Sequence, residues 1–295
     1  MLLQPDCIGC IYKASLSGIR ELTTDDGLTK ELISEILRIP GITRPAWDLT
    51  SPEVFEPALG LISRSFATPD PFRSMKDRQN EKGMQLLPQL RNLVKESDDP
   101  LSTAANLAII GNSLDLMWSG GSVDVEPLVR KELERRPAPK HFRLLEQRLI
   151  ESRTVLIFAD NCGEIVFDKV FLETVRTVCD PEIYYVVRSV PALNDATLED
   201  ARLVGLDALA HPIENGIQGP LPGTVLSRCS QDVRDLTEKA DLIISKGGGN
   251  FDSLEEATHL HDKMLFMLMS KCVPYCRYFG TEMFDPILSP PKRPV

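Results

Sequence analysis

The sequence predicts an α/β protein in which an all-α N-terminal domain precedes a three-layer domain built on a parallel sheet. Residues 15–150 have the pattern of helices separated by proline and glycine. Beyond Arg153, short apolar segments alternate with helical stretches, as in strand-helix-strand units with right-handed crossovers. A chain of 295 residues can bury two cores, so we expect one domain over 1–150 and another over 151–295.

Two aspartate-proline pairs mark helix starts in the N-terminal half. Asp70-Pro71 predicts a helix that runs through Val94, because Asp caps the first turn and Pro is tolerated at the first helical position. Asp99-Pro100 predicts a second helix over 101–117. Its apolar residues recur at steps of three and four, as one buried face requires: Leu107, Ile110, Leu114 and Met117. We expect Gly120-Gly121 to end it.

Five segments in the C-terminal half have the composition of strands buried on both faces, which appear as continuous apolar runs. These segments are 154–159, 183–188, 206–211, 241–245 and 273–277. We expect the proline-rich tail from Ser289 to Val295 to be loosely held.

The composition excludes several kinds of partner. A net charge of -10, without a cluster of basic and aromatic residues, argues against nucleic acid. The longest apolar runs, 155–159 and 264–269, are too short to span a bilayer, and the N-terminus shows no basic region followed by an apolar stretch, so we expect a cytoplasmic protein that does not use a membrane. Seven scattered cysteines, an odd number, fit reduced thiols in a cytosol.

Oxygen-rich residues follow the first two predicted strands. Asp160 and Asn161 come directly after the first, and Asp195 lies shortly after the second. Ligands of open parallel sheets bind beyond the carboxyl ends of the strands, so these three side chains converge if the strands are neighbours. Two carboxylates and an amide oxygen suit a hard divalent cation. The alternative is that each residue only caps the next helix.

The fourth predicted strand is followed by Lys246 and the glycines 247–249. Glycines let backbone N–H groups approach an anion, and a helix starting near Asp252 would add its positive end. Together with the lysine charge, this pattern indicates a phosphate cradle. The spacing is not that of a P-loop, and a glycine run after a strand is commonly a simple turn.

The cysteines include one Cys-x-x-Cys pair, Cys7 and Cys10. A tetrahedral metal site needs further ligands, for which Cys272 and Cys276 are the candidates; the alternative is two packed, reduced thiols. We do not interpret Cys162 as a nucleophile, because no histidine is placed in the sequence to serve as its base.

Taken together, these patterns resemble the damage-control phosphatase family of metal-dependent enzymes, over almost the whole chain. The matching segments are 6–10, 70–72 with Lys76 and Asn80, 108–115, 160–168, 191–197, 222–224, 245–250 and 271–272. The Cys-x-x-Cys pair resembles the microbial and archaeal-like branch.

The resemblance implies helices packed on a Rossmann-like α/β/α domain, with a divalent Mn, Ni, Co or Mg ion held by Asp160, Asn161 and Asp195. It implies that Lys246, Gly247 and Gly248 bind the phosphate. Glu164, Asn250 and Asn112 would lie near the pocket. We therefore expect a catalytic set of Asp160, Asn161, Asp195 and Lys246 that hydrolyses small phosphorylated metabolites.

Two other interpretations stay open: an AdoMet-dependent carboxyl methyltransferase, and a non-catalytic sensor that binds a phosphometabolite. The oligomeric state is not predicted.

Overall fold

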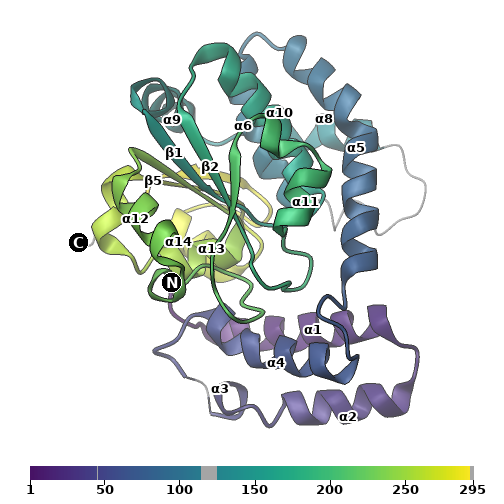
Figure 1. The fold of residues 1–295 in the computed structure, drawn as a ribbon. Helices are drawn as coiled ribbons and strands as arrows, with labels where there is room; N and C mark the ends of the chain where they lie inside the picture. Colours follow the sequence, from purple (N-terminus) through teal and green to yellow (C-terminus); the bar gives the residue numbers. More distant parts are fainter. Residues whose placement is uncertain (45, 114–124, 293–295) are drawn as a thin grey trace.

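The computed structural model describes residues 1–44, 46–113 and 125–292. A six-stranded sheet of order β3-β2-β1-β4-β5-β6 lies at its centre (Figure 1). The first five strands are parallel, and β6 runs antiparallel to β5. The strands are β1 (Thr154–Phe158), β2 (Glu182–Val187), β3 (His211–Glu214), β4 (Leu242–Lys246), β5 (Met264–Met269) and β6 (Pro286–Ser289).

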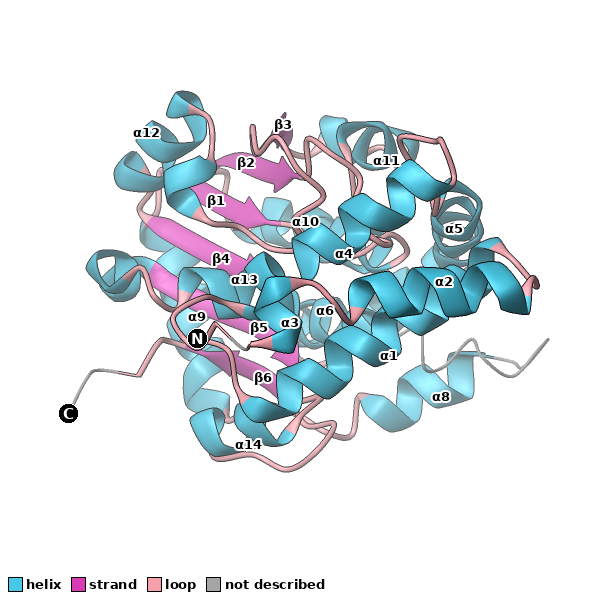
Figure 2. Cartoon of the chain, turned by 90° about the horizontal axis from the view of Figure 1, so that it is seen from below, coloured by secondary structure: helices cyan, strands magenta, loops and turns pink. Residues whose placement is uncertain are grey.

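Helices cover both faces of the sheet, which gives the predicted three layers (Figure 2). One face packs against α5 (Arg73–Lys95), α6 (Pro100–Ile110), α8 (Val125–Glu132), α9 (Pro139–Glu151), α10 (Glu164–Val178) and α11 (Leu198–Leu203). The other face packs against α12 (Gln231–Lys239), α13 (Gly247–Leu254) and α14 (Val273–Phe279). Short 3-10 turns complete the chain: η1 (Gly111–Ser113), η2 (Leu206–Ala208), η3 (Leu226–Arg228) and η4 (Thr258–Lys263).

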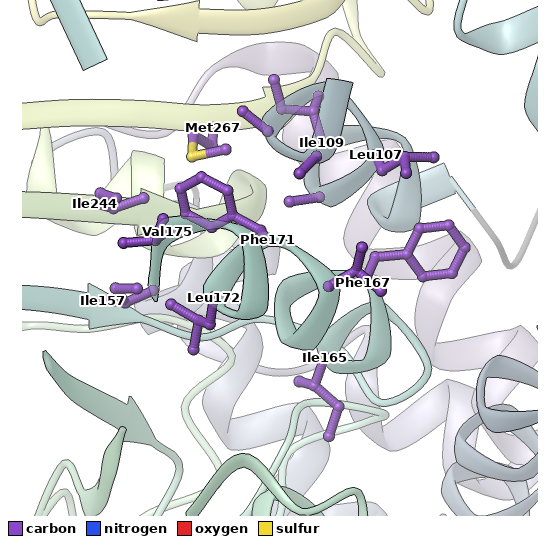
Figure 3. Close-up of a cluster of buried hydrophobic side chains, with 14 of the residues drawn as sticks. Leu107, Ile109, Ile157, Ile165, Phe167, Phe171, Leu172, Val175, Ile244 and Met267 are labelled. Atoms are coloured by element: carbon purple, nitrogen blue, oxygen red, sulfur yellow. The ribbon is translucent and has the colours of Figure 1, made fainter. Parts of the chain in front are cut away.

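The core on the first face is continuous from helix to strand. Phe171 of α10 lies in the same cluster as the sheet residue Met267 and the α6 residue Ile109, with its ring beside Met267 (Figure 3). All three side chains are almost completely buried. Burying a side chain of this size contributes about 1.5–3 kcal/mol, so this layer fixes α6 and α10, and with them the loops at their ends.

The first four helices form a separate cluster. They are α1 (Pro5–Leu22), α2 (Asp26–Ile36), α3 (Pro40–Thr43) and α4 (Ser51–Ser65). Their apolar residues, such as Ile19, Leu32 and Ile62, share a core of their own. This cluster lies across the edge of the sheet at which the parallel strands end (Figures 1 and 2).

The structure confirms the mixed α/β fold, but two of the five strands lie at other residues than predicted. Segment 206–211 contains the turn η2, and β3 begins only at His211. Segment 273–277 is helical, because Cys272 takes an extended N-cap conformation and Pro274 lies in the first turn. The fifth strand is the methionine-rich run of β5, and a sixth strand, β6, ends at Ser289, the first residue of the predicted loose tail.

The predicted helices also shift at their ends. The helix expected from Asp70 begins at Arg73, since the Asp70 side chain accepts a hydrogen bond from Lys76 Nζ at 2.9 Å instead of capping. Helix α6 is capped by Asp99, as expected, and ends at Ile110. Leu114, Met117 and the Gly120-Gly121 pair lie outside the described residues. In the part of the chain that the structure describes, no helix has the length and apolarity needed to cross a bilayer.

Helices α5, α6 and α9 share the core of the sheet rather than that of α1–α4. The hydrophobic packing therefore does not divide at residue 150, and separate domains over 1–150 and 151–295 stay a prediction.

Candidate active site

Two loops that follow neighbouring strands meet at the carboxyl edge of the sheet. The loop after β1 carries Asp160 and Asn161, and the loop after β2 carries Asp195. Asn161 and Asp195 form an isolated antiparallel bridge, and the Ala196 amide donates to the Asp160 carbonyl at 2.8 Å. The structure therefore brings together the three residues that the sequence predicted as metal ligands. We call them the Asp160 cluster.

Amide side chains hold the first carboxylate of this cluster. Asn112 Nδ2 donates to Asp160 Oδ2 at 2.6 Å and to Glu164 Oε2 at 2.8 Å. Asn161 Nδ2 donates to the same two oxygens at 2.6 and 3.2 Å. Charge-assisted hydrogen bonds of this kind fix an orientation as well as contributing energy. Asn112 and Glu164 thus lie beside the cluster, where the family resemblance places them.

A second chain of hydrogen bonds holds Asp195. Arg188 Nε donates to Asp195 Oδ2 at 2.6 Å, and Arg188 Nη1 donates to Thr224 Oγ1 at 2.9 Å. Thr224 donates in turn to Asn250 Oδ1 at 2.8 Å, while Asn250 Nδ2 donates to the Ala159 carbonyl at 2.7 Å. The Asn250 side chain is completely buried. Its amide therefore ties β1 to α13, and this geometry does not support the predicted contact with substrate.

The buried carboxylates are short of positive charge. Burial raises the pKa of Asp160 well above its usual range, and the charges of Glu164 and Asp195 raise it further. Burial also raises the pKa of Asp195, although the Arg188 guanidinium opposes this. Ionised carboxylates so close together in a low-dielectric setting are costly unless a cation offsets them. Two carboxylates with an amide oxygen are the donor set that Mg and Mn prefer, so these residues fit a hard divalent cation.

The structure places Lys246 differently from the sequence prediction. Its side chain is 1% exposed, and its Nζ donates to the Ala108 carbonyl, Glu164 and Asp168 at 3.0, 2.5 and 2.6 Å. Burial opposes the charge, but the two carboxylates raise the pKa of the lysine. All three N–H groups have protein acceptors, so the predicted direct contact with phosphate is not supported. Lys246 instead lies beneath the Asp160 cluster and holds Glu164.

The glycine run forms the start of a helix. Helix α13 begins at Gly247, not near Asp252 as predicted. Gly247 has a φ of 75°, and a Cβ there would lie 1.9 Å from Asp160 Oδ2, so only glycine lets the helix start against this carboxylate. Gly248 and Gly249 follow with their backbone beside the cavity described next. The first turn of a helix presents free N–H groups and a positive dipole end, which suit an anion.

A cavity of about 290 Å³ opens beside the Asp160 cluster. Asn112, Asp160 and Lys271 line it on the side of the sheet. Residues of α1 and α4, such as Cys10 and Phe55, line the opposite wall. Lys271 Nζ donates a hydrogen bond to the Asn112 carbonyl. The cavity is thus lined by one carboxylate of the Asp160 cluster, an amine and the first turn of a helix.

A family model for the damage-control phosphatase ARMT1-like domain matches residues 3–287. The chain belongs to this family. A damage-control phosphatase of Archaeoglobus fulgidus is 29% identical over 291 residues, which cover 97% of this chain and 98% of that protein. An uncharacterized protein of Methanocaldococcus jannaschii, MJ0202, is 30% identical over 298 residues, which cover 97% of this chain and 94% of that protein.

The fold has a solved counterpart. The crystal structure of a DUF89 family protein from Pyrococcus horikoshii superposes with a TM-score of 0.86 at 24% identity, covering 99% of this chain and all of that one. The damage-control phosphatase PH1575 of the same organism is 30% identical over 208 residues, 70% of each chain. Membership of the damage-control phosphatase family supports a phosphatase activity for this chain.

Three of the cysteines also lie at the cavity. Cys7, Cys10 and Cys272 all line it. Burial raises the pKa of Cys272 to about 12 and also raises that of Cys7, so both thiols are protonated at neutral pH. Among the described residues, no group of three or more His, Cys, Asp or Glu side chains is arranged to hold a metal ion. The structure therefore gives no support to the predicted second metal site.

Two residues of this cavity were missed as functional candidates. Lys271 follows β5, and it was overlooked because the fifth strand was predicted at 273–277. Asp252 was mentioned only as a helix start, although it lies on the cavity wall. The rule that ligands bind after the strands would have found Lys271 with the correct strand. No pattern in the sequence distinguishes Asp252.

Proposed function

We propose that this member of the damage-control phosphatase family is a metal-dependent enzyme that hydrolyses small phosphomonoesters. In this proposal, Asp160, Asn161 and Asp195 hold one divalent ion, which can be Mn, Ni, Co or Mg. The observation that carries the proposal is the backbone pairing that brings these three residues together at the strand ends, with Asp160 on the wall of a cavity. Their crowded negative charge supports a cation at that place.

The residues around the cluster take distinct roles. The ammonium of Lys271 and the N–H groups of the first turn of α13 bind phosphoryl oxygens, because they are the cationic and donor groups on the cavity wall. Asn112 and Glu164 hold Asp160 in place through the amide hydrogen bonds described above. Lys246 acts as a positioning residue, since it contacts Glu164 and not the cavity.

When bound, the cation would polarise the phosphoryl group and lower the pKa of a water molecule. The chain contributes fixed donors that face the negative charge developing on phosphorus, and such preorganised donors need no rearrangement during the reaction. Asp160 serves either as a ligand and base for an attacking water or as the nucleophile itself. Rapid quenching followed by a search for phosphorylated Asp160 distinguishes the two routes.

The test is a phosphate-release assay with p-nitrophenyl phosphate and fructose 1-phosphate, each with Mn, Ni, Co or Mg. We expect turnover that disappears with a chelator, and a loss of at least about two orders of magnitude in Asp160→Ala. Asp98→Asn is the matched control, because Asp98 is exposed and lies just before the N-terminus of α6. Asn112 follows the C-terminus of that helix, so Asp98 is at the end of α6 that faces away from the site. Unchanged turnover in Asp160→Ala would refute the proposal.

The same assay separates the two alternatives. A sensor would bind the esters without releasing phosphate, and a carboxyl methyltransferase would need AdoMet and no phosphate ester. Binding of a phosphate ester by calorimetry, combined with no release under any metal, would favour the sensor.

A further inference from the structure

The first turns of α5 have a buried polar face. Lys76, Gln79, Asn80 and Gly83 lie on one side of the helix, because they are three, four and seven residues apart, and all four are buried. Further along α5 the buried residues are apolar, such as Leu90. Polar side chains in a buried position are costly unless they have hydrogen-bond partners. The partners of this face therefore indicate its role.

Asn80 contacts the loop that carries Asp160 and Asn161. Its Oδ1 accepts a hydrogen bond from the backbone N–H of Gly163 at 2.8 Å. Gly163 is the N-cap of α10, has a φ of 77° and lies two residues after Asn161. The two helices approach so closely here that a Cβ on Gly83 would lie 3.0 Å from the Gly163 carbonyl oxygen. Asn80 thus holds the end of the first loop of the Asp160 cluster.

The same amide is linked to the loop that carries Asp195. Asn80 Nδ2 donates to Asp200 Oδ1 at 3.1 Å, and the Asp200 side chain is completely buried. Asp200 Oδ2 accepts hydrogen bonds from the N–H and the hydroxyl of Thr197 at 2.9 and 2.6 Å. Thr197 is the N-cap of α11 and lies two residues after Asp195. One side chain of α5 therefore connects the ends of both loops.

Buried ion pairs hold Asp200 against α5. Lys76 is completely buried, and its Nζ lies 2.8 Å from Asp200 Oδ2 and 2.9 Å from Asp70 Oδ2. Arg73 Nη2 donates to Asp200 Oδ1 at 2.7 Å. Burial opposes the charge of Asp200, but Lys76 and Thr197 lower the pKa of this carboxyl to about 2. The carboxylate is therefore ionised at neutral pH and fixed in orientation by charge-assisted hydrogen bonds.

These side chains lie behind the site and not in the cavity. Lys76, Asn80 and Asp200 are not among the described residues that line it, and they bind the two loops and one another. A divalent ion depends on such support, because Mg requires oxygen ligands at about 2.0–2.1 Å in near-octahedral geometry. Residues that orient metal ligands typically contribute about tenfold to a hundredfold in metal affinity.

We propose that Asn80 is a positioning residue for the metal ligands: its amide sets the spacing of the loops after β1 and β2, and thereby the affinity for the divalent ion. This inference rests on the proposed metal site. The two loops are also joined directly, by the bridge between Asn161 and Asp195. That bridge ties the loops to each other, whereas Asn80 ties both of them to α5.

The test measures metal binding directly. In calorimetric titrations with Mn, we expect Asn80→Ala to raise the Kd by about tenfold to a hundredfold over wild type. Leu90→Ala is the matched control, since Leu90 is buried on the same helix but packs in the apolar core. Its Tm should fall at least as much as that of Asn80→Ala, because a large cavity costs as much as an unsatisfied buried N–H group, while its Kd stays unchanged.

Hydrogen exchange gives a readout that needs no metal. The Gly163 amide loses its acceptor in Asn80→Ala, so exchange at this amide in the metal-free protein should be faster than in wild type and in Leu90→Ala. Equal exchange at Gly163 in the two variants would contradict a local role for Asn80.

A reciprocal exchange of the two groups tests the hydrogen bond between them. In Asn80→Asp, a carboxylate faces Asp200, so we expect the Kd for Mn to rise. Adding Asp200→Asn restores one donor and one acceptor between these positions and keeps an acceptor for the Gly163 amide. The double variant should therefore recover part of the lost affinity, and no recovery would contradict the proposed role. This pair decides the question if Asn80→Ala does not fold.

The outcomes separate this inference from the proposed function. An unchanged Kd in Asn80→Ala, together with loss of the ion in Asp160→Ala, would overturn the inference and leave the metal site in place. An equal rise of the Kd in Leu90→Ala would also overturn it, because general destabilisation would then explain both. Absence of Mn binding in wild type would remove the proposed metal site and the inference together.

Discussion

Replacing Lys246 by Met tests the buried ion pairs beneath the Asp160 cluster. The change keeps the length and apolar body of the side chain but removes the ammonium that Glu164 and Asp168 contact at 2.5 and 2.6 Å. Breaking a buried ion pair by removing one partner costs about 3–5 kcal/mol, because the other charge is left uncompensated. Unfolding entropy for a chain of this length is about 0.6 kcal/mol per degree, so Tm should fall by about 5–8 °C.

The matched control is Lys271→Met. Lys271 is exposed and lines the cavity, so its removal should change Tm little and lower kcat/KM by about tenfold to a hundredfold through weaker phosphate binding. Calorimetry gives Tm, and phosphate release gives kcat and KM. Adding Glu164→Gln and Asp168→Asn to Lys246→Met should recover part of the lost stability, because the uncompensated charges are then gone.

The reasoning fails if the two lysines behave the other way round. A Lys246→Met variant with the wild-type Tm and a strongly raised KM would mean that this lysine contacts the substrate. The sequence analysis predicted such a contact with the phosphate of the substrate.

Three further predictions follow from the site. Gly247→Ala should abolish most activity and destabilise the fold, because its Cβ would overlap Asp160 Oδ2 at 1.9 Å and its φ is 75°; activity and Tm measured together check this. Burial raises the pKa of Asp252 from 3.8 to about 6, so the folded state keeps a proton that the unfolded chain loses, and its contribution to the unfolding free energy falls by up to about 3 kcal/mol as the pH rises through that window. Urea titrations should therefore show that wild type loses stability relative to Asp252→Asn between these two pH values, and parallel curves would contradict the assignment. A divalent ion at one hundred times its Kd should raise the unfolding free energy by about 2.7 kcal/mol, and Asp195→Asn should remove this gain in calorimetry, whereas an equal gain in that variant would place the ion elsewhere.

Much of the architecture could be predicted because buried parallel strands appear in the sequence as continuous apolar runs. The strands β1, β2 and β4 are apolar runs rich in valine and isoleucine, and the polar loops after two of them meet as the topology requires. The fifth strand was missed because it is built largely of methionine and leucine, which lack β-branching. Segment 273–277 contains Val and Tyr, yet Pro274 and the extended Cys272 start a helix there.

The buried position of Lys246 has a simple geometric origin. Side chains alternate between the two faces of a strand, and Leu242 and Ile244 point into the core shared with α10. Lys246 is the last residue of β4 and falls on the same face, so it turns inward rather than toward the cavity. The alternation of side chains along β4 could be predicted from the sequence. The sequence did not predict that Glu164 and Asp168 of α10 lie beside Lys246, where they stabilise its buried ammonium.

The cavity has two walls that belong to different hydrophobic cores. One wall is the strand edge, stabilised by the sheet and its helices, and the other comes from α1 and α4, which pack with α2 and α3. Substitutions in the outer wall can reshape the space for the alcohol portion of a substrate while the packing beneath Asp160 stays intact. A chimaera that carries residues 1–65 of a relative on this sheet should therefore change which esters are accepted and keep the same need for a cation.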